Sequence, residues 1–260
     1  MDFKKILITG GAGFVGSNIA IKLRQQFPNT KITCLDNLNR RGSELALKRL
    51  KQAGIDFIHG DIRNREDLEL NDTYDLIIEC SAEPSVLAGI NSSPDYLINT
   101  NLIGTINCLE VARKTGANVF FLSTSRIYPI SYINELDYTE SEWRFNISDD
   151  QKTIGASSEG IAENFPLDKP RSLYGTTKLA SELLLAEYID TYGVKGILNR
   201  CGVITGPWQM GKVDQGVFVL WVAKHYFNQS LSFIGYGGEG KQVRDFIHID
   251  DLYKAIVTQL

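Results

Sequence analysis

The sequence has no excess of positive charge and no long hydrophobic run. It contains 27 lysines and arginines against 31 aspartates and glutamates, a formal net charge of -4, and its isoelectric point is near 5.5. Binding to nucleic acid or anionic lipid normally needs a basic surface, so neither a nucleic acid nor a membrane is expected as partner. The first apolar run, residues 6–8, stops at Thr9. It is far too short for a signal peptide, and no segment is long enough to span a membrane.

Cysteine is scarce, and its spacing carries no motif. The four cysteines lack C-x-x-C or metal-ligand spacing and are scattered at Cys34, Cys80, Cys108 and Cys201. This pattern argues against a disulfide framework and a cysteine metal site, and it favours reduced, buried thiols of a cytoplasmic protein. The hydrophobic content of 43% and charged content of 22% are ordinary for a globular domain. The 260 residues suffice for one large domain, or for a domain with a smaller appendage.

A glycine-rich turn follows the first apolar run. Gly10, Gly13 and Gly16 lie between residues 6–8, which we predict as a strand, and a helical pattern that ends at Pro28. This spacing lets the chain turn tightly, lets a diphosphate approach the amides at the helix N-terminus, and lets the helix pack on the strand. The order of strand, turn and helix makes the motif a candidate dinucleotide site, and a purely structural turn is the alternative.

Polar residues follow the next two predicted strands. The second strand ends in Asp36 and Asn37, and the third is followed by Asp61 and Ile62. A carboxylate in the place of Asp36 can accept both ribose hydroxyls of an adenosine and would repel a 2′-phosphate, which favours NAD over NADP. Asp61 can reach the adenine amino group, with Ile62 packing on the ring, although an acidic residue after a third strand is commonly on the surface.

Tyr174 and Lys178 lie four residues apart at the start of a predicted helix. Their side chains therefore share one face of that helix. A phenol ordinarily ionises near pKa ~10, and a cation beside it favours the phenolate, which makes the pair a candidate acid and base. Alone, this spacing also occurs by chance in many helices.

Predicted strands alternate with predicted helices along the first 200 residues. The strands are residues 6–8, 31–35, 56–59, 76–80 and 119–122, and the helices include residues 43–53 and 94–115. This alternation predicts right-handed βαβ units and a parallel sheet. Ligands bind beyond the carboxyl ends of such strands, where the glycine turn, Asp36, Asp61, Ser81 and Thr124 all fall.

Seven motifs, in this order, resemble the extended short-chain dehydrogenase/reductases that act on nucleotide sugars. They are T-G-G-A-G-F-V-G at residues 9–16, L-D-N-L at 35–38, G-D-I-R at 60–63, N-L-I-G-T at 101–105, S-T-S-R-I-Y at 123–128, Y-G-T-T-K at 174–178 and V-R-D-F-I-H-I-D-D at 243–251. Within that group, V-D-Q-G at 213–216 and G-K-Q-V-R-D at 240–245 look most like the CDP-paratose 2-epimerases, or tyvelose epimerases. The motifs cover nearly the whole chain.

The resemblance implies a fold, a cofactor and a substrate class. The fold is a doubly wound parallel sheet of the α/β class (Rossmann), with residues 1–200 as the NAD-binding domain and 201–260 as a partial substrate lobe interleaved with the sheet. The substrate is a nucleotide-diphosphate sugar, and the partner is a second copy of the chain, through the helix that carries Tyr174 and the helix at 94–115. Family members generally continue beyond Leu260, so we expect the lobe to be incomplete.

The resemblance also implies roles for single residues. Tyr174 matches the base, Thr124 the residue that hydrogen-bonds the reacting sugar oxygen, and Lys178 the residue that binds the nicotinamide ribose and lowers the tyrosine pKa. Asn101 matches a structural asparagine. The predicted substrate-binding residues are Thr124, Arg244, Gln215 and Glu83. The predicted cofactor-binding residues are Gly10, Gly13, Phe14, Val15, Gly16, Asp36, Asn37, Asp61, Ile62, Ser81 and Lys178. No metal site is expected.

Departures from the family pattern narrow the reaction. The 4,6-dehydratases place Asp-Glu directly after the threonine because water elimination needs an extra acid and base, whereas this chain has Ser125 and Arg126. That favours an epimerase which oxidises one carbinol to a keto-sugar and takes the hydride back. Two alternatives stay open, a nucleotide-sugar dehydrogenase or reductase and a non-catalytic dinucleotide-binding sensor. Residues 130–169 form a long acidic segment that we expect to be a flap over the sugar or an oligomer contact.

Overall fold

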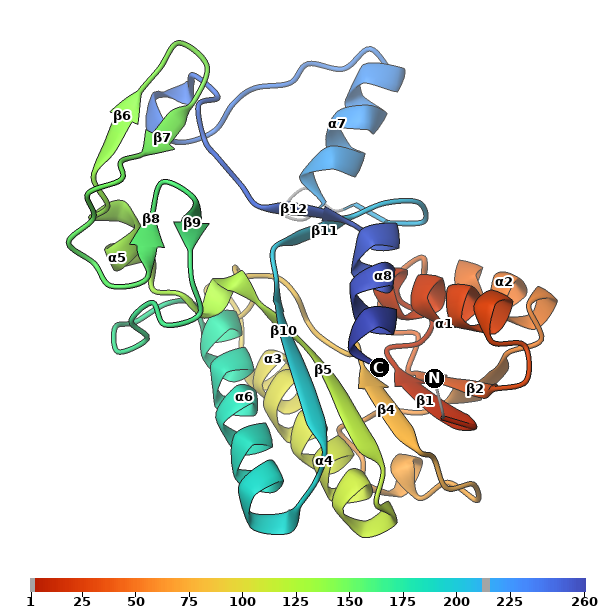
Figure 1. Cartoon of the computed structure of the whole chain (residues 1–260). Helices are drawn as coiled ribbons and strands as arrows, with labels where there is room; N and C mark the ends of the chain where they lie inside the picture. The colour runs from red at the N-terminus through yellow and green to blue at the C-terminus, as the bar shows by residue number, and fades with distance from the viewer. Residues whose placement is uncertain (1–2, 212–215) are drawn as a thin grey trace.

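A six-stranded parallel sheet forms the centre of the computed structural model, which describes residues 3–211 and 216–260. The strand order is β10-β5-β4-β1-β2-β3 (Figure 1). The strands are β1 (Lys5–Thr9), β2 (Lys31–Asp36), β3 (Asp56–His59), β4 (Leu76–Glu79), β5 (Asn118–Thr124) and β10 (Gly196–Cys201). Helices cover both faces of the sheet, so the prediction of a doubly wound α/β fold is confirmed.

Both faces of the sheet are apolar, which explains why its strands read as nearly continuous hydrophobic runs. Neighbouring residues of a strand point to opposite faces. Ile6 and Ile8 of β1 therefore enter the cluster beneath α1 (Phe14–Gln26). Leu7 enters the second cluster, beneath α4 (Gly104–Thr115).

The helix predicted over residues 94–115 is present but interrupted. It consists of α3 (Asp95–Ile98), a π-helical turn (Asn99–Ile103) and α4. Within the turn, the backbone carbonyl of Asn101 accepts hydrogen bonds from the hydroxyls of Thr105, at 2.9 Å, and Ser181, at 3.1 Å. Side chains thus compete for a carbonyl that a regular helix would use itself.

The helix that carries Tyr174 has clear start and stop signals. It is α6 (Leu173–Tyr192), and the Ser172 side chain caps it by accepting from the Gly175 amide at 3.0 Å. Gly193, at φ 69°, ends it in the left-handed conformation that glycine tolerates best. Helix α6 packs beside α4 on one face of the sheet.

The remaining elements are short turns, helices and strands. They are 3-10 turns at Ser43–Leu45, Glu66–Leu68, Ser125–Ile127 and Tyr236–Gly238, helices α2 (Ala46–Gln52), α5 (Ile130–Asn134), α7 (Val217–Tyr226) and α8 (Ile249–Gln259), and strands β6 (Tyr138–Glu140), β7 (Phe145–Ile147), β8 (Ala156–Ser157), β9 (Gly160–Ile161), β11 (Val203–Thr205) and β12 (Phe246–His248). Helix α8 packs on α1, and its Ile249, Leu252 and Ile256 join the core of the sheet. The last 60 residues therefore contribute to the first domain as well as to the outer part, and the predicted boundary at residue 200 stays a prediction.

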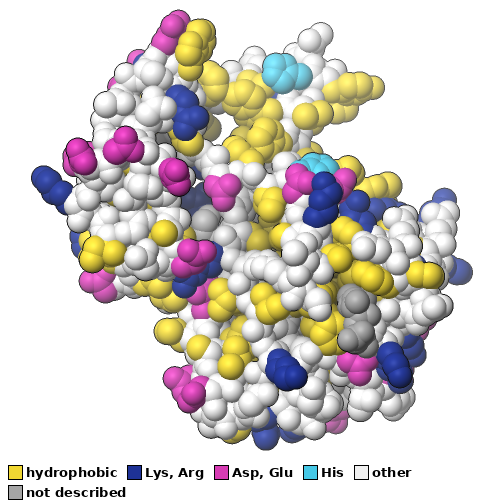
Figure 2. Space-filling view, viewed as in Figure 1, with side chains coloured by type: hydrophobic (Ala, Val, Ile, Leu, Met, Phe, Trp, Pro, Cys, Tyr) yellow, Lys and Arg dark blue, Asp and Glu magenta, His cyan; other side chains and the backbone are white. Residues whose placement is uncertain are grey.

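Helix α7 leaves much apolar surface uncovered. Its Val222 and Tyr226 are 68% and 82% exposed. In Figure 2, hydrophobic side chains gather over this part of the molecule, and the surface is hollowed between it and the part that carries β6 and β7. Of the described residues, no helix combines the length and the apolarity needed to cross a bilayer.

Candidate functional site

The glycine turn brings the backbone of β1 against the start of α1. Gly10 has φ 62°, and the Gly13 amide donates to the Gly10 carbonyl at 3.0 Å. A Cβ added to Gly16 would lie 2.3 Å from that carbonyl oxygen. The turn therefore tolerates no side chain where helix and strand meet. Gly13 is the N-cap of α1, so the following amides, those of Phe14 and Val15 among them, begin the helix at an open edge.

Asp36 ends β2 directly beside this turn. Its carboxylate accepts the Ala12 amide at 3.0 Å and the Leu38 amide at 2.8 Å. Burial raises the pKa of Asp36, and these amides act in the opposite direction. The carboxylate thus braces the glycine turn and lies half-buried at the edge where we predict the adenosine ribose.

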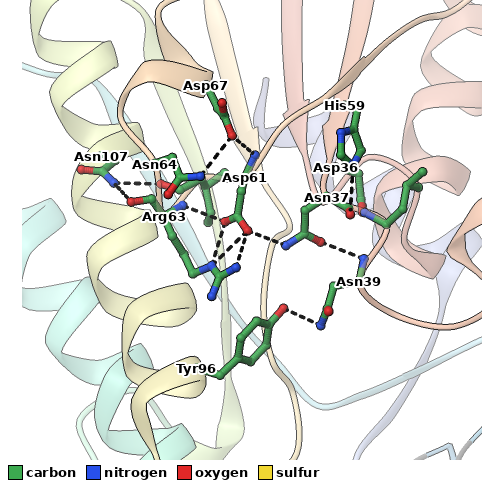
Figure 3. Close-up of polar contacts among 12 residues, drawn as sticks. Asp36, Asn37, Asn39, His59, Asp61, Arg63, Asn64, Asp67, Tyr96 and Asn107 are labelled. Carbon is green, nitrogen blue, oxygen red and sulfur yellow. Dashed lines mark hydrogen bonds and ion pairs between the residues drawn. The ribbon is translucent and has the colours of Figure 1, made fainter.

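Asp61 lies in a polar network with Asn37 (Figure 3). The Asp61 carboxylate accepts hydrogen bonds from the Arg63 guanidinium, at 2.6 Å from Nη2, and from Asn37 Nδ2 at 2.8 Å. Arg63 in turn lies 4.8 Å from the centre of the Tyr96 ring. Those two hydrogen bonds reach Oδ2, and Oδ1 accepts from Arg63 Nε at 3.0 Å, so both Asp61 oxygens have partners within the protein. The contact of Asp61 with the adenine amino group stays a prediction.

Ile62 and Ser81 flank the same edge. Ile62 is 4% exposed, and its Cδ1 lies 2.4 Å from where a Cβ on Gly104 would be. Glycine at that position lets the isoleucine seat against α4. Ser81 lies two residues after the end of β4, and its amide nitrogen lies 2.8 Å from where a Cβ on Gly10 would be. The predicted cofactor residues in the glycine turn, Asp36, Asn37, Asp61, Ile62 and Ser81 thus lie at or just after the carboxyl ends of β1, β2, β3 and β4, which are neighbours in the sheet.

The three predicted catalytic residues converge at the end of β5. Thr124, Tyr174 and Lys178 are 7%, 9% and 2% exposed. The cause of the close approach is Gly175, because a Cβ there would lie 2.1 Å from the carbonyl oxygen of Arg126. Only glycine lets the first turn of α6 rest on the turn after β5.

The predicted substrate residues are less closely grouped. Arg244 is exposed, and its guanidinium donates to the Gln242 side chain at 3.2 Å. Glu83 forms a local turn, since its Oε1 accepts the Ser85 amide at 3.1 Å. Asn101 ties this turn to the rest, donating to the Glu83 carbonyl at 3.0 Å. Gln215 lies outside the described residues.

Two residues at the site have no assigned role in the sequence-based prediction. Arg126 follows Thr124, and burial, together with the positive charge of Arg244, lowers its pKa, so the two guanidinium groups act on one another. Glu79 ends β4 inside the protein, 3.7 Å from Lys178 Nζ. In the sequence, Glu79 could have been found as the one acidic residue at the end of an otherwise apolar strand. Among residues 3–211 and 216–260, no group of three His, Cys, Asp or Glu side chains is arranged to hold a metal ion.

The comparisons with known proteins agree with this geometry. Residues 6–260 match the model of the "NAD dependent epimerase/dehydratase family". CDP-paratose 2-epimerase of Salmonella typhi is 32% identical over 98% of this chain and 74% of its own length. The chain thus spans about three quarters of that relative.

Two solved structures share the fold and contain NAD. UDP-glucose 4-epimerase of Thermus thermophilus in complex with NAD has a TM-score of 0.74 at 26% identity, covering 98% of this chain and 74% of that one. dTDP-glucose 4,6-dehydratase of Bacillus anthracis in complex with NAD has a TM-score of 0.75 at 26% identity, covering 98% and 71%. NAD fits these residues: the glycine turn lets a diphosphate approach the backbone, and the carboxylate of Asp36 can accept the ribose hydroxyls. The chain belongs to the NAD-dependent epimerase/dehydratase family.

Proposed function

We propose that the chain is an epimerase of nucleotide-diphosphate sugars that acts by transient oxidation to a keto-sugar. One observation carries the proposal: Thr124, Tyr174 and Lys178 are all buried, at the end of β5 and on the first turns of α6, which Gly175 brings against the turn after β5. The relative among CDP-paratose 2-epimerases makes a CDP-sugar the first substrate to try. Bound NAD supplies hydride acceptance and return.

The chain's own residues handle the proton and the charge. Tyr174, as phenolate, removes the proton from the sugar hydroxyl and later gives it back. Thr124 donates a hydrogen bond to the reacting oxygen and stabilises the charge that develops there. Lys178, one helical turn after Tyr174, favours the phenolate by its positive charge. Arg244 and Arg126 are proposed to bind the diphosphate, because a guanidinium fork matches phosphate oxygens. Glu83 and Gln215 are proposed to orient the sugar.

The turn after β5 separates epimerisation from dehydration. Elimination of water needs an acid and a base beyond the tyrosine, and this turn carries Ser125 and Arg126 instead. An arginine cannot act as a base at neutral pH. Epimerisation needs only the reversible removal of a proton and a hydride, which the three buried residues suffice to support.

The test has two steps. Purified protein is denatured to measure released NAD, and cofactor-loaded protein is then screened by NMR against CDP-, UDP-, GDP- and dTDP-hexoses. We expect NAD to be released and one sugar to be converted into its epimer with no net change in cofactor.

Other outcomes would identify the alternatives. Consumption of free cofactor in proportion to product would identify a dehydrogenase or reductase. NAD release with no turnover of any sugar would favour a dinucleotide-binding sensor. Loss of water from the sugar would contradict the interpretation of Ser125 and Arg126.

We further propose that the protein is a cytoplasmic homodimer joined through α4 and α6. Leu183 and Ile189 on α6 are 62% and 40% exposed, and a helix–helix contact with a second copy would cover them. All four cysteines are free, as in a reducing compartment. Sedimentation should give twice the chain mass, and Leu183→Glu should shift it to one chain mass. A monomeric wild-type protein would contradict the dimer.

A further inference from the structure

Glu79 is a buried carboxylate that faces Lys178 in the candidate site. It ends β4, whose other residues are Leu76, Ile77 and Ile78, and its side chain is 1% exposed. Within the described part of the chain, neither carboxylate oxygen has a partner at normal hydrogen-bond distance. The Ser81 amide and the Lys178 ammonium are the donors close enough to lower the pKa of this carboxyl. A charge in such a position costs free energy, and a merely packed position would be filled more stably by an apolar residue.

Lys178 is the cation that faces this carboxylate. Its Nζ lies 3.7 Å from Glu79 Oε2 and 4.5 Å from the centre of the Phe121 ring. The lysine side chain is 3% exposed, so water contributes little to holding its charge. The same lysine follows Tyr174 by one turn of α6.

The other titratable neighbours of the pair are thiols and the Tyr174 phenol. Burial raises the pKa of Cys80 and Cys108 well above the usual range, and it raises the pKa of Cys201 to about 11. These thiols are therefore neutral at physiological pH and supply no counter-charge. Burial also raises the pKa of Glu79 itself, while the charge of Lys178 opposes that rise.

We propose that Glu79 is a positioning residue that acts through Lys178, because its buried carboxylate faces the ammonium at 3.7 Å and holds it charged and in place whether or not the Tyr174 phenol is ionised. The proposal rests on the proposed function, in which Lys178 contacts the cofactor ribose and favours the Tyr174 phenolate. A buried ammonium without a counter-charge gives up its proton more readily than a paired one. Removing the Glu79 charge should therefore make cofactor binding sensitive to alkaline pH.

The chain offers a matched control on the same helix. Glu182 lies one turn after Lys178, is also buried, and pairs with Arg200 at 2.9 Å. Its carboxylate also accepts the hydroxyl of Ser123. Glu182→Gln thus breaks a buried ion pair without touching Lys178, so it reproduces the loss of stability but not the effect on the site.

The experiment measures NAD affinity by calorimetry on cofactor-free full-length protein from about pH 7 to pH 9. We expect the NAD affinity of Glu79→Gln to fall by about tenfold over this range. The reason is that the charged fraction of a lysine falls tenfold for each pH unit above its pKa. The NAD affinity of the wild type and of Glu182→Gln should stay nearly constant over the same pH range. Turnover should show the same difference between the variants. Affinity in Glu79→Gln that is as constant as in the control would overturn the proposal.

A second variant separates charge from shape and covers poor folding of the first. Glu79→Asp keeps the charge but shortens the side chain, whereas Glu79→Gln keeps the shape. We expect Glu79→Asp to retain constant affinity across the pH range. If the aspartate variant loses affinity as pH rises, a negative charge at this position does not keep Lys178 charged, and the proposal fails. If glutamine behaves as wild type while aspartate is impaired at every pH, Glu79 only fills space, and the proposal fails as well.

Lys178→Met tests the proposed function independently of Glu79. If this variant binds NAD and turns over sugar like wild type, the role proposed for Lys178 is wrong, whatever Glu79 does. If it loses both while Glu79→Gln stays insensitive to pH, only the inference about Glu79 is overturned.

Discussion

At the scale of single residues, Asp36 has two tasks at once. Its carboxylate holds the Ala12 amide of the glycine turn and lies where an adenosine ribose is expected. A hydrogen bond to a charged group contributes roughly 1.5–3 kcal/mol, so its loss should be visible in binding.

We therefore predict that Asp36→Ala weakens NAD binding by about tenfold or more, since 1.4 kcal/mol corresponds to a factor of ten. The preference for NAD over NADP should narrow, because the charge that repels a 2′-phosphate is gone. Calorimetry with both cofactors measures this. Asp56→Ala, at an exposed position on β3, is the control and should bind both as wild type. An unchanged preference in Asp36→Ala would contradict the assignment.

Tyr174 is the residue on which catalysis depends in this account. Tyr174→Phe should reduce turnover by about 100- to 10,000-fold, the usual contribution of a general acid and base, while NAD affinity changes little. Tyr188→Phe on the same helix is the control, since its hydroxyl donates to Glu110 at 2.6 Å, away from the site. Steady-state rates on an accepted sugar decide the matter. Comparable rates for the two variants would exclude Tyr174 as the base.

At the scale of elements, α1 depends on close contact with β1. In an open helix position, changing glycine to alanine would stabilise by about 1 kcal/mol. At Gly16 the added Cβ would meet the Gly10 carbonyl at 2.3 Å, and backbone cannot move aside cheaply. At Gly16 the change to alanine should therefore destabilise the protein instead of stabilising it.

We predict that Gly16→Ala lowers the free energy of unfolding by at least about 1 kcal/mol and weakens NAD binding, because the turn must open. Chemical denaturation and calorimetry measure the two effects. Gln25→Ala, at an exposed position late in the same helix, should be neutral or slightly stabilising. A stabilised Gly16→Ala protein would refute the close contact as a constraint.

The sequence predicted the regular elements better than the irregular ones. The strands and helices of the central sheet follow from apolar runs and caps, as in Ser172 for α6. At the π-helical turn Asn99–Ile103, the Asn101 carbonyl accepts hydroxyls from Thr105, four residues on, and from Ser181 of α6. No local pattern reveals the contact with Ser181. Residues 130–169, expected as one long loop, fold into short hairpins packed around Phe165. The role of this segment as a flap over the sugar or as an oligomer contact stays a prediction.

At the scale of the whole molecule, stability at acid pH should depend on a few paired carboxylates. Burial acts to raise the pKa of Asp61, but hydrogen bonds from Arg63 and Asn37 outweigh it and lower the pKa to about 2 from 3.8. Hydrogen bonds from Arg113 and Tyr188 lower the pKa of Glu110 to about 2 as well. Between about pH 2 and pH 4 the unfolded chain therefore binds more protons than the folded one.

The free energy of unfolding should therefore be highest above about pH 4 and fall as pH drops through 2. Asp61→Asn cannot titrate, so it should be less stable at neutral pH and show a shallower fall. Urea unfolding over this pH range measures both slopes. Asp190→Asn, at an exposed position of α6, should leave the slope of the wild type unchanged. Equal slopes in all three proteins would show that Asp61 gains nothing from its partners.

The arrangement of the site was predictable because parallel strands bring their carboxyl ends to one edge. The glycine turn, Asp36 and Thr124 could be grouped from the order of strands alone. The partners of these residues could not. Asn37 donates to Asp61, and Glu79 faces Lys178, through contacts between segments far apart in the sequence, which only the packed fold creates.

Turnover of an accepted nucleotide sugar in deuterium oxide tests the central claim most directly. If the sugar is oxidised and reduced again with the same hydride, the product carries no deuterium at the inverted carbon. Mass spectrometry and proton NMR of the epimer would show this. Deuterium at that carbon would mean exchange of a proton with solvent, and it would contradict the oxidation that Tyr174, Thr124 and Lys178 are proposed to support.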